Sequence, residues 1–352
     1  MFISIFILFA IVAFVSAAKH YIDRSHLNET YYGKTRFAVD NFIDPPRMNL
    51  LYRMLLKNKH YFYEAPEKCF IFEGQKHYQI FETIIDEEDR KKSNLQDCHS
   101  TPDGRSCYDR ALHILRNQAD RYDSTAAQEF REELEAYVHI RDKIFEYASE
   151  ALNTTVVSCM GGDGVIFFYY VPKSPVLMTL NGRGYIRTPH VDYYRFQGTY
   201  DRPLTYLKPE VYGNIVRRYS ATLYFDDIPE SSGGVFEWYD FPNNHKLPPE
   251  TGYKIPLNSQ EYPEHQYLRN NNYYSPSFAD PDLNITRIQS RKGKLLLFSA
   301  QDDLHGVREY SGTEERWALM FALSNKETMD LRRKGVIKQD LLDKVGPAAV
   351  VN

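Results

Sequence analysis

The sequence predicts an α+β fold, in which a mostly helical N-terminal region precedes an antiparallel β-sandwich or a jelly-roll barrel. Two patterns in the 352 residues lead to this expectation. Residues 106–152 place apolar side chains at three- and four-residue spacing without internal proline or glycine, as amphipathic helices do. Beyond residue 153, short β-branched and aromatic runs are separated by glycine, proline, asparagine and aspartate, as short strands are.

Seven runs have the character of strands, and that many over about 170 residues indicates a sandwich or jelly roll. They are "VIFFYYV", "VLMTL", "YSATLYF", "GGVFEWY", "ITRIQS", "KLLLFSA" and "RWALMFAL". We therefore expect a leader at residues 1–18, a mostly helical region at 19–150 and a β domain at 151–345. Residues 240–283, rich in proline, asparagine and tyrosine, would be a long insertion, which is usually functional or disordered.

The first 18 residues are an apolar run that closes in small residues, as a signal peptide does, although it lacks the usual positive start. An uncleaved anchor is the alternative. Four cysteines suit two disulfides, with Cys98 and Cys107 the favoured pair because a turn-rich segment separates them. Glycosylation sequons begin at Asn28, Asn153 and Asn284. These features predict a chain of the endoplasmic reticulum lumen or a secreted one, with no membrane contact once the leader is cleaved.

The net charge of −4 excludes a protein that coats nucleic acid through a basic surface, so we expect no nucleic-acid partner. The chemistry is predicted instead by "HVDYY" at 190–194. Residues i and i+2 of a strand share a face, so His190 and Asp192 could hold one metal ion. Taken alone, the pair could equally be two polar residues at a strand end.

The C-terminal stretch adds a second histidine, His305, at the start of "HGV" after a strand. Two histidines and one carboxylate are the ligand set of non-haem Fe(II) oxygenases. Arg316 follows in the next strand, and its planar fork can hold a carboxylate through two hydrogen bonds. The alternatives are a turn histidine and an arginine paired with Glu314 or Glu315.

The order of these motifs resembles the 2-oxoglutarate and Fe(II)-dependent dioxygenases, and most closely the catalytic domain of the prolyl 3-hydroxylases (the leprecan group). The resemblance covers residues 150–345 and is carried by "HVDYY", "YSATLYFDD", "GGVFEW", "GKLLLFS", "HGV" and Arg316. It implies a double-stranded β-helix, the jelly roll of this family. His190, Asp192 and His305 match the iron ligands, Arg316 matches the catalytic residue that binds 2-oxoglutarate, and Tyr224 matches a second residue on the same carboxylate.

The resemblance also implies the cofactors and the substrate class. Fe(II), 2-oxoglutarate as co-substrate and ascorbate would be required, and the substrate would be a prolyl residue of collagen or of another polypeptide of the secretory pathway. Two alternatives stay open. One is a catalytically inactive jelly roll that acts as a binding or chaperone module, and the other is a lysyl hydroxylase-like enzyme of the same chemistry.

Overall fold

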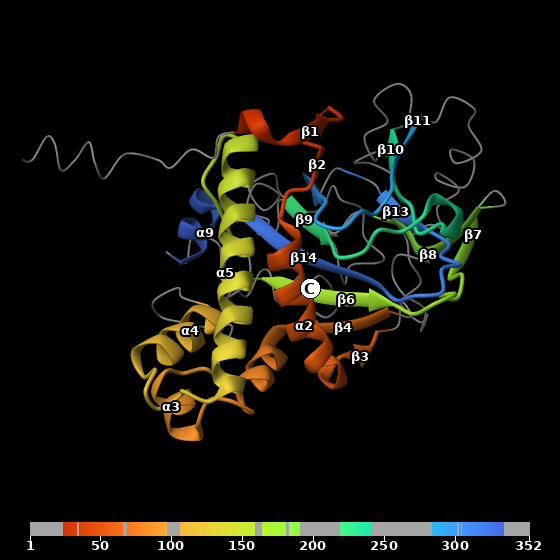
Figure 1. Ribbon diagram of the computed structural model, residues 1–352. Coiled ribbons are helices and arrows are strands. Elements are labelled where there is room, and N and C mark those ends of the chain that lie inside the picture. Colours follow the sequence, from red (N-terminus) through yellow and green to blue (C-terminus); the bar gives the residue numbers. More distant parts are fainter. Residues whose placement is uncertain are drawn as a thin grey trace, which may run out of the picture.

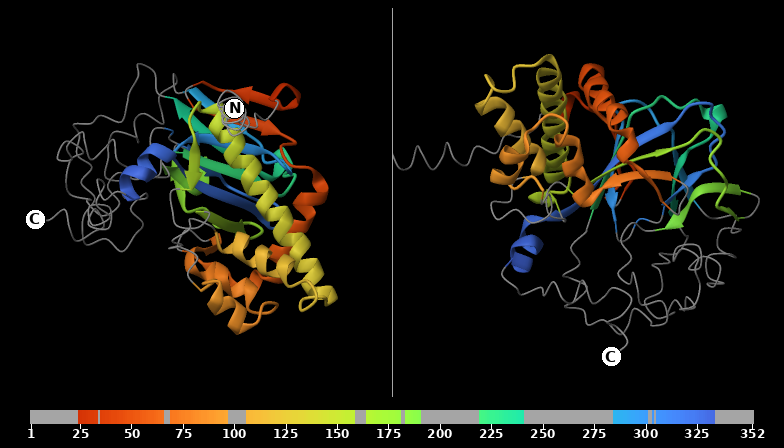
Figure 2. Two further views of the ribbon diagram at one scale, coloured as in Figure 1. Left: turned by 90° about the vertical axis from the view of Figure 1, so that its left-hand side faces the viewer. Right: turned by 90° about the horizontal axis from the view of Figure 1, so that it is seen from below.

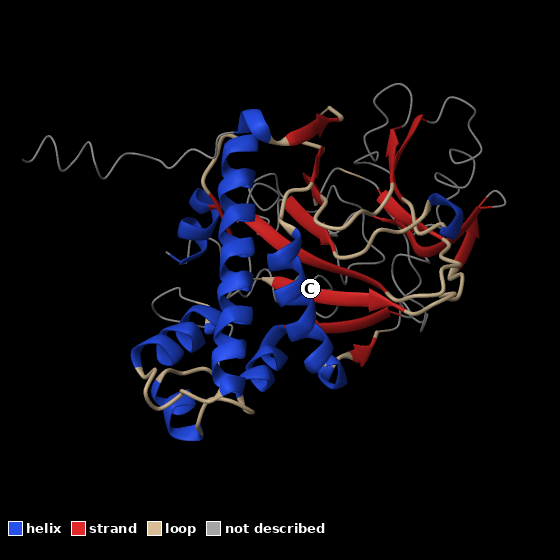
Figure 3. Ribbon diagram, viewed as in Figure 1, coloured by secondary structure: helices blue, strands red, loops and turns tan. Residues whose placement is uncertain are grey.

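The computed structural model describes residues 24–333 except 34, 66–68, 97–105, 159–163, 181–182, 191–218, 241–283, 301–302 and 304. Within these ranges the protein has three layers: helices, a larger antiparallel sheet and a smaller antiparallel sheet (Figures 1 and 3). This arrangement confirms the α+β class with helices from the N-terminal region. The expected leader at 1–18 and residues 241–283 of the expected insertion lie outside the described residues.

The two sheets form a double-stranded β-helix, because the chain passes back and forth between them in jelly-roll order. The barrel strands of the larger sheet lie in the order β12-β9-β14-β6, and those of the smaller sheet in the order β11-β10-β13-β8. The predicted jelly roll is therefore confirmed by the strand order. The eight strands are β6 (Val165–Tyr170), β8 (Arg183–His190), β9 (Tyr219–Tyr224), β10 (Phe236–Asp240), β11 (Asn284–Ile288), β12 (Leu295–Ser299), β13 (His305–Arg308) and β14 (Arg316–Asn325).

Further strands extend both sheets, and four of them come from the region that was expected to be mostly helical. On one side of the larger sheet β2 pairs with β12 and β1 pairs with β2, while on the other β4 pairs with β6 and β3 with β4. The N-terminal region thus completes the sheet as well as covering it. The additional strands are β1 (Asn28–Tyr31), β2 (Phe37–Asp40), β3 (Tyr63–Glu64), β4 (Cys69–Glu73), β5 (Val156–Ser158) and β7 (Met178–Leu180).

The helices begin at the capping residues that the sequence provides. Asp44 accepts a hydrogen bond from the main chain of Arg47 ahead of α2, Ser106 and Asp109 form a capping box on α4, and Ser124 caps α5. The α-helices are α2 (Pro45–Lys57), α3 (Glu87–Lys92), α4 (Cys107–Asn117), α5 (Thr125–Ala151) and α9 (Lys326–Arg333). The 3-10 helices are η1 (Arg24–His26), η2 (Lys59–Tyr61), η3 (Gly74–Phe81) and η5 (Glu230–Ser232). No helix of the described ranges is long and apolar enough to cross a membrane.

Two apolar clusters lie on the two faces of the larger sheet, and β14 contributes to both. Trp317, Leu319 and Phe321 belong to the cluster between this sheet and the helices, where α5 runs across the sheet (Figure 2). Ala318 belongs to the cluster inside the barrel, between the two sheets. Because side chains alternate along a strand, Arg316 shares the inward face of Ala318.

The cysteines do not form the two disulfides expected from their even number. Cys107, at the first turn of α4, is disulfide-bonded, whereas Cys69 on β4 is a buried thiol. Cys98 and Cys159 lie outside the described residues, so the favoured pairing of Cys98 with Cys107 stays a prediction. An even count fixes neither the number of bridges nor their connectivity, and Cys69 packs as a small apolar residue against the barrel interior.

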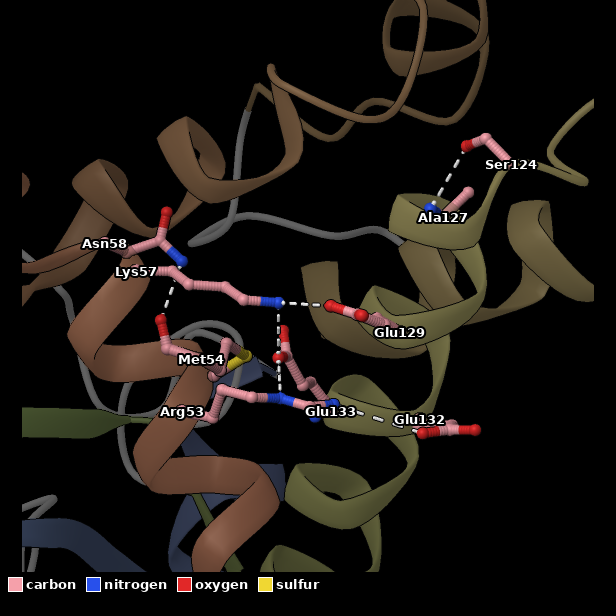
Figure 4. Close-up of polar contacts among 9 residues, drawn as sticks. All are labelled: Arg53, Met54, Lys57, Asn58, Ser124, Ala127, Glu129, Glu132 and Glu133. Atoms are coloured by element: carbon pink, nitrogen blue, oxygen red, sulfur yellow. Dashed lines mark hydrogen bonds and ion pairs between the residues drawn. The ribbon is translucent and has the colours of Figure 1, made fainter.

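A buried carboxylate joins α2 to α5 (Figure 4). The side chain of Glu133 on α5 is fully buried, and it accepts hydrogen bonds from Arg53 Nε at 2.7 Å and from Lys57 Nζ at 2.9 Å. Both cations lie on α2 and keep part of their surface in water. Glu132 beside it is exposed and approaches Arg53 only at 4.0 Å. The buried carboxylate therefore fixes how the two helices cross.

Replacing Glu133 with glutamine should lower the free energy of unfolding by about 1–3 kcal/mol, the usual contribution of hydrogen bonds to charged groups. The cations left behind can be solvated, which keeps the loss in this range. Urea denaturation followed by circular dichroism would measure it. Glu132→Gln is the matched control on the same helix and should leave the unfolding midpoint unchanged. Equal effects of both variants would contradict the assignment.

Candidate functional site

The smaller sheet brings together the two histidines that the sequence pattern singles out. In the antiparallel register of β8 and β13, His190 is paired with His305, and bulges follow further along the two strands. His190 ends β8 and His305 begins the antiparallel β13, so both lie at the same end of two neighbouring strands. Asp192, the third expected ligand, lies outside the described residues.

The imidazole of His305 is buried in an aromatic environment and its orientation is fixed. The ring of Phe236 stacks on it at 5.1 Å and the ring of Phe298 meets it edge-on at 4.7 Å. Its Nδ1 lies 2.9 Å from the main-chain oxygen of Asp303. A carbonyl oxygen only accepts hydrogen bonds, so in the neutral ring Nδ1 carries the proton and Nε2 carries the lone pair. Metal-bound histidines have this arrangement, in which the other ring nitrogen donates to a carbonyl or carboxylate.

Inside the barrel, Arg316 lies between two tyrosines. Its guanidinium carbon is 5.0 Å from the ring centre of Tyr224 and 5.7 Å from that of Tyr170. Its Nη2 donates to Ser290 Oγ at 3.0 Å. The structure thus brings together Arg316 and Tyr224, both expected to bind one carboxylate. Ser290 and Tyr170 complete the surroundings, and no sequence pattern had marked them.

Among the described residues Arg316 forms no direct ion pair with a carboxylate, although it interacts at longer range with the buried carboxyl of Asp226. Arg316 is 1% exposed, its Nε has no hydrogen-bond partner, and within the described ranges no acidic side chain forms an ion pair with it. An uncompensated charge of this kind costs several kcal/mol. A planar guanidinium with open donors matches a carboxylate ligand in both charge and shape. Arg316 therefore fits the carboxylate end of a small acid such as 2-oxoglutarate.

The glycine pair of "GGVFEW" allows the chain to pass close to this arginine. Gly234 has a φ of +65°, and a Cβ there would lie 3.3 Å from Arg316 Cδ. At Gly233, with a φ of +71°, a Cβ would lie 2.2 Å from the main-chain oxygen of Glu309. Any larger residue would push the start of β10 away from Arg316.

The ligand set expected from the sequence is one that suits iron. No group of three His, Cys, Asp or Glu side chains able to hold a metal occurs among the described residues, which do not include Asp192. The set expected from the sequence would add one carboxylate to two imidazoles, which are ligands of the kind and number that iron(II) takes. The pairing of His190 with His305 and the fixed ring of His305 agree with such a site.

No family model matches the sequence, and no curated protein matches it. Solved structures resemble the chain at low identity. A prolyl hydroxylase from Trichoplax adhaerens, in complex with a hypoxia inducible factor peptide fragment, is 12% identical with a TM-score of 0.38 and 84% of this chain and 86% of that chain covered. A Pseudomonas putida prolyl-4-hydroxylase is 11% identical with a TM-score of 0.34, covering 83% and 92%. The non-heme alpha ketoglutarate dependent carbocyclase SnoK from nogalamycin biosynthesis is 11% identical with a TM-score of 0.40, covering 83% and 80%.

Asp226, which is far from β14 in the sequence, places a titratable carboxyl group beside Arg316 and Trp317 of that strand. Its Oδ2 accepts a hydrogen bond from the main-chain nitrogen of Trp317 at 2.6 Å. Burial raises the pKa of this carboxyl to about 6, although the Trp317 hydrogen bond and the charge of Arg316 both act to lower it. Between about pH 4 and pH 6 the folded protein therefore holds a proton here that the unfolded chain, with a pKa near 3.8, has released.

Over this pH range the folded state binds more protons than the unfolded state, so the free energy of unfolding of the wild type should fall as the pH rises from about 4 to about 6. Asp226→Asn keeps an acceptor for Trp317 and removes the buried charge. The two-unit pKa difference corresponds to about 3 kcal/mol, which partial solvent access reduces to roughly 1–2 kcal/mol. Denaturant unfolding should show the variant more stable at pH 7 and equal to wild type below pH 4. A gain that does not change with pH would contradict this.

Proposed function

We propose that the protein is a 2-oxoglutarate and Fe(II)-dependent dioxygenase that hydroxylates a residue of a polypeptide. The observation that carries the proposal is the buried Arg316, a cation inside the barrel without a carboxylate partner among the described residues. A ligand that brings a carboxylate into the barrel would balance it. The paired positions of His190 and His305 supply the other half of the site.

Each residue of the site would have a separate task. His190, Asp192 and His305 would hold the iron, and Arg316 would hold the distal carboxylate of 2-oxoglutarate, with Tyr224 on the same group. When bound, iron and 2-oxoglutarate supply the oxidising chemistry that inserts oxygen into a C–H bond. Ser290 orients the guanidinium through Nη2, so its remaining donors are set before the acid arrives.

The barrel wall around the histidine excludes water. Phe236, Trp238 and Phe298 are buried and in ring contact with one another, and two of them contact His305. An apolar wall of this kind protects a reactive site from solvent and strengthens the charge interaction at Arg316.

For the substrate we propose a prolyl residue, in collagen or in another polypeptide of the secretory pathway, with ascorbate supporting turnover. The support is the motif order shared with the prolyl 3-hydroxylases and the features of a secreted chain. Asn28, Asn153 and Asn284, which begin the sequons, are all exposed, as glycosylation requires. The disulfide at Cys107 fits an oxidising compartment such as the endoplasmic reticulum lumen.

The purified chain with Fe(II), ascorbate and 2-oxoglutarate should release succinate, and a proline-rich collagen peptide should increase the rate. His305→Ala should reduce succinate to background while leaving the fold intact, because it removes a metal ligand. His113→Ala, on the exposed face of α4, is the control and should match wild type. Mass spectrometry would locate the added oxygen on a prolyl or a lysyl residue. A folded, metal-loaded wild type without succinate release would overturn the enzyme proposal and favour the binding module.

Arg316→Gln should raise the 2-oxoglutarate concentration needed for half-maximal succinate release by about 10- to 100-fold, the equivalent of a lost charged hydrogen bond of about 1.5–3 kcal/mol. Metal affinity should change little, because the arginine does not coordinate. Arg308→Gln is the matched control, since Arg308 lies on β13 with its guanidinium over the ring of Tyr185, 5.2 Å from the ring centre. Unchanged 2-oxoglutarate dependence in Arg316→Gln would remove this residue from the site.

A further inference from the structure

Arg36 is buried as deeply as Arg316, and it enters the barrel region from the N-terminal segment. It lies directly before β2 and is 1% exposed. Its Nε donates to Asp303 Oδ1 at 2.8 Å and its Nη1 donates to Asp240 Oδ2 at 2.7 Å. Arg36 is thus held between the connection that precedes β13 and the end of β10.

Asp303 connects this arginine to the metal-site histidine. The aspartate is fully buried, and its Oδ2 accepts a hydrogen bond from the main-chain nitrogen of Ser299 at 2.8 Å. Its own main-chain oxygen accepts the Nδ1 proton of His305 at 2.9 Å. The side chain of Asp303 is therefore tied to Ser299 at the end of β12, and its carbonyl oxygen holds the imidazole of His305 at the start of β13.

The position of the Asp303 carbonyl oxygen sets the direction in which Nε2 of His305 points. The ring can rotate only as far as its hydrogen bond to Asp303 allows, and partners of this kind influence metal affinity about 10- to 100-fold. Without Arg36, Asp303 would be an uncompensated buried carboxylate. It would have to move to reach water, and its main-chain oxygen would move with it.

We propose that Arg36 is a positioning residue of the iron site, acting through Asp303 on the orientation of His305. This inference rests on the proposed function, since it takes His305 to be a metal ligand. It assigns to the N-terminal segment, which lies outside the stretch that resembles the dioxygenases, a share in building the site. Lysine would keep the charge but not the fork that reaches two carboxylates at once.

The competing explanation is that Arg36 only anchors β2 to the larger sheet. A second ion pair on the same strands separates the two explanations. Lys294 Nζ lies 2.9 Å from Asp40 Oδ1, and so joins the chain directly before β12 to the end of β2. This pair anchors the same strand, but neither residue contacts Asp303 in the described interactions. Lys294→Met therefore loosens β2 without disturbing the turn before His305.

The experiment measures the affinity of the full chain for Co(II) by isothermal titration calorimetry, in the absence of substrate. The thermal stability of the metal-free protein is measured in parallel. Arg36→Lys should weaken Co(II) binding about 10-fold or more, and Lys294→Met should bind as wild type does. If Arg36→Lys does not fold, the double variant R36M/D303N replaces the pair by neutral side chains and should show the same loss.

The outcomes separate the two proposals. Wild type that binds no Co(II) overturns the proposed function and this inference with it. Wild-type binding with equal affinity in Arg36→Lys, or in the folded double variant, overturns the positioning role alone. An equal loss in Arg36→Lys and Lys294→Met also overturns it, because the effect would then come from anchoring β2. A loss confined to the Arg36 and Asp303 variants supports it.

Discussion

Burial of β14 on both faces is the constraint on which the rest of the structure depends. The strand pairs with β6 on one side and β9 on the other, so its position is fixed in the middle of the larger sheet. Its outward side chains need the helices as a cover, and its inward side chains need the second sheet. One residue of shift would exchange the two sets, placing Trp317 in the barrel and Arg316 among the helices. The helical cover and the position of Arg316 inside the barrel therefore depend on the same register of β14.

Arg36 and Arg316, the two most deeply buried arginines of the described residues, show how similar groups acquire different roles through their surroundings. Arg36 is balanced by Asp303 and Asp240, and such a buried pair fixes geometry more than it adds stability. Arg316 has tyrosine rings and a serine hydroxyl for neighbours, with no ion-pair partner in the described part of the chain. A buried charge without an ion-pair partner lowers the stability of the ligand-free protein, and an anionic ligand bound beside it would remove this cost. The first arginine is suited to holding the site in place, and the second to recognising what enters.

Regular periodicity explains what could be predicted from the sequence. The long helical pattern became α4 and α5, and all seven apolar runs occur as strands. The two barrel strands outside that set, β8 and β13, carry the histidines: β8 reads "RGYIRTPH", with glycine, proline and two arginines, and β13 has four residues. Their strand character comes from their neighbours.

Arg36 and Asp303 are separated by 267 residues, and no local pattern encodes such a contact. Asp192 stays a prediction, while the expectation of two disulfides was wrong because Cys69 is a thiol.

The pairing of β2 with β12 has a consequence for how the chain reaches its folded state. Residues 37–39 are synthesised about 250 residues before their partners, residues 295–297. Until then the hydrogen-bonding edge of β2 has no neighbour on that side, and unpaired edges of this kind invite association with other chains. Contacts so distant in sequence also form slowly, because the intervening loop must close first. A fragment that begins at the barrel would consequently lack strand β2 of its own larger sheet and leave the edge of β12 unpaired on that side.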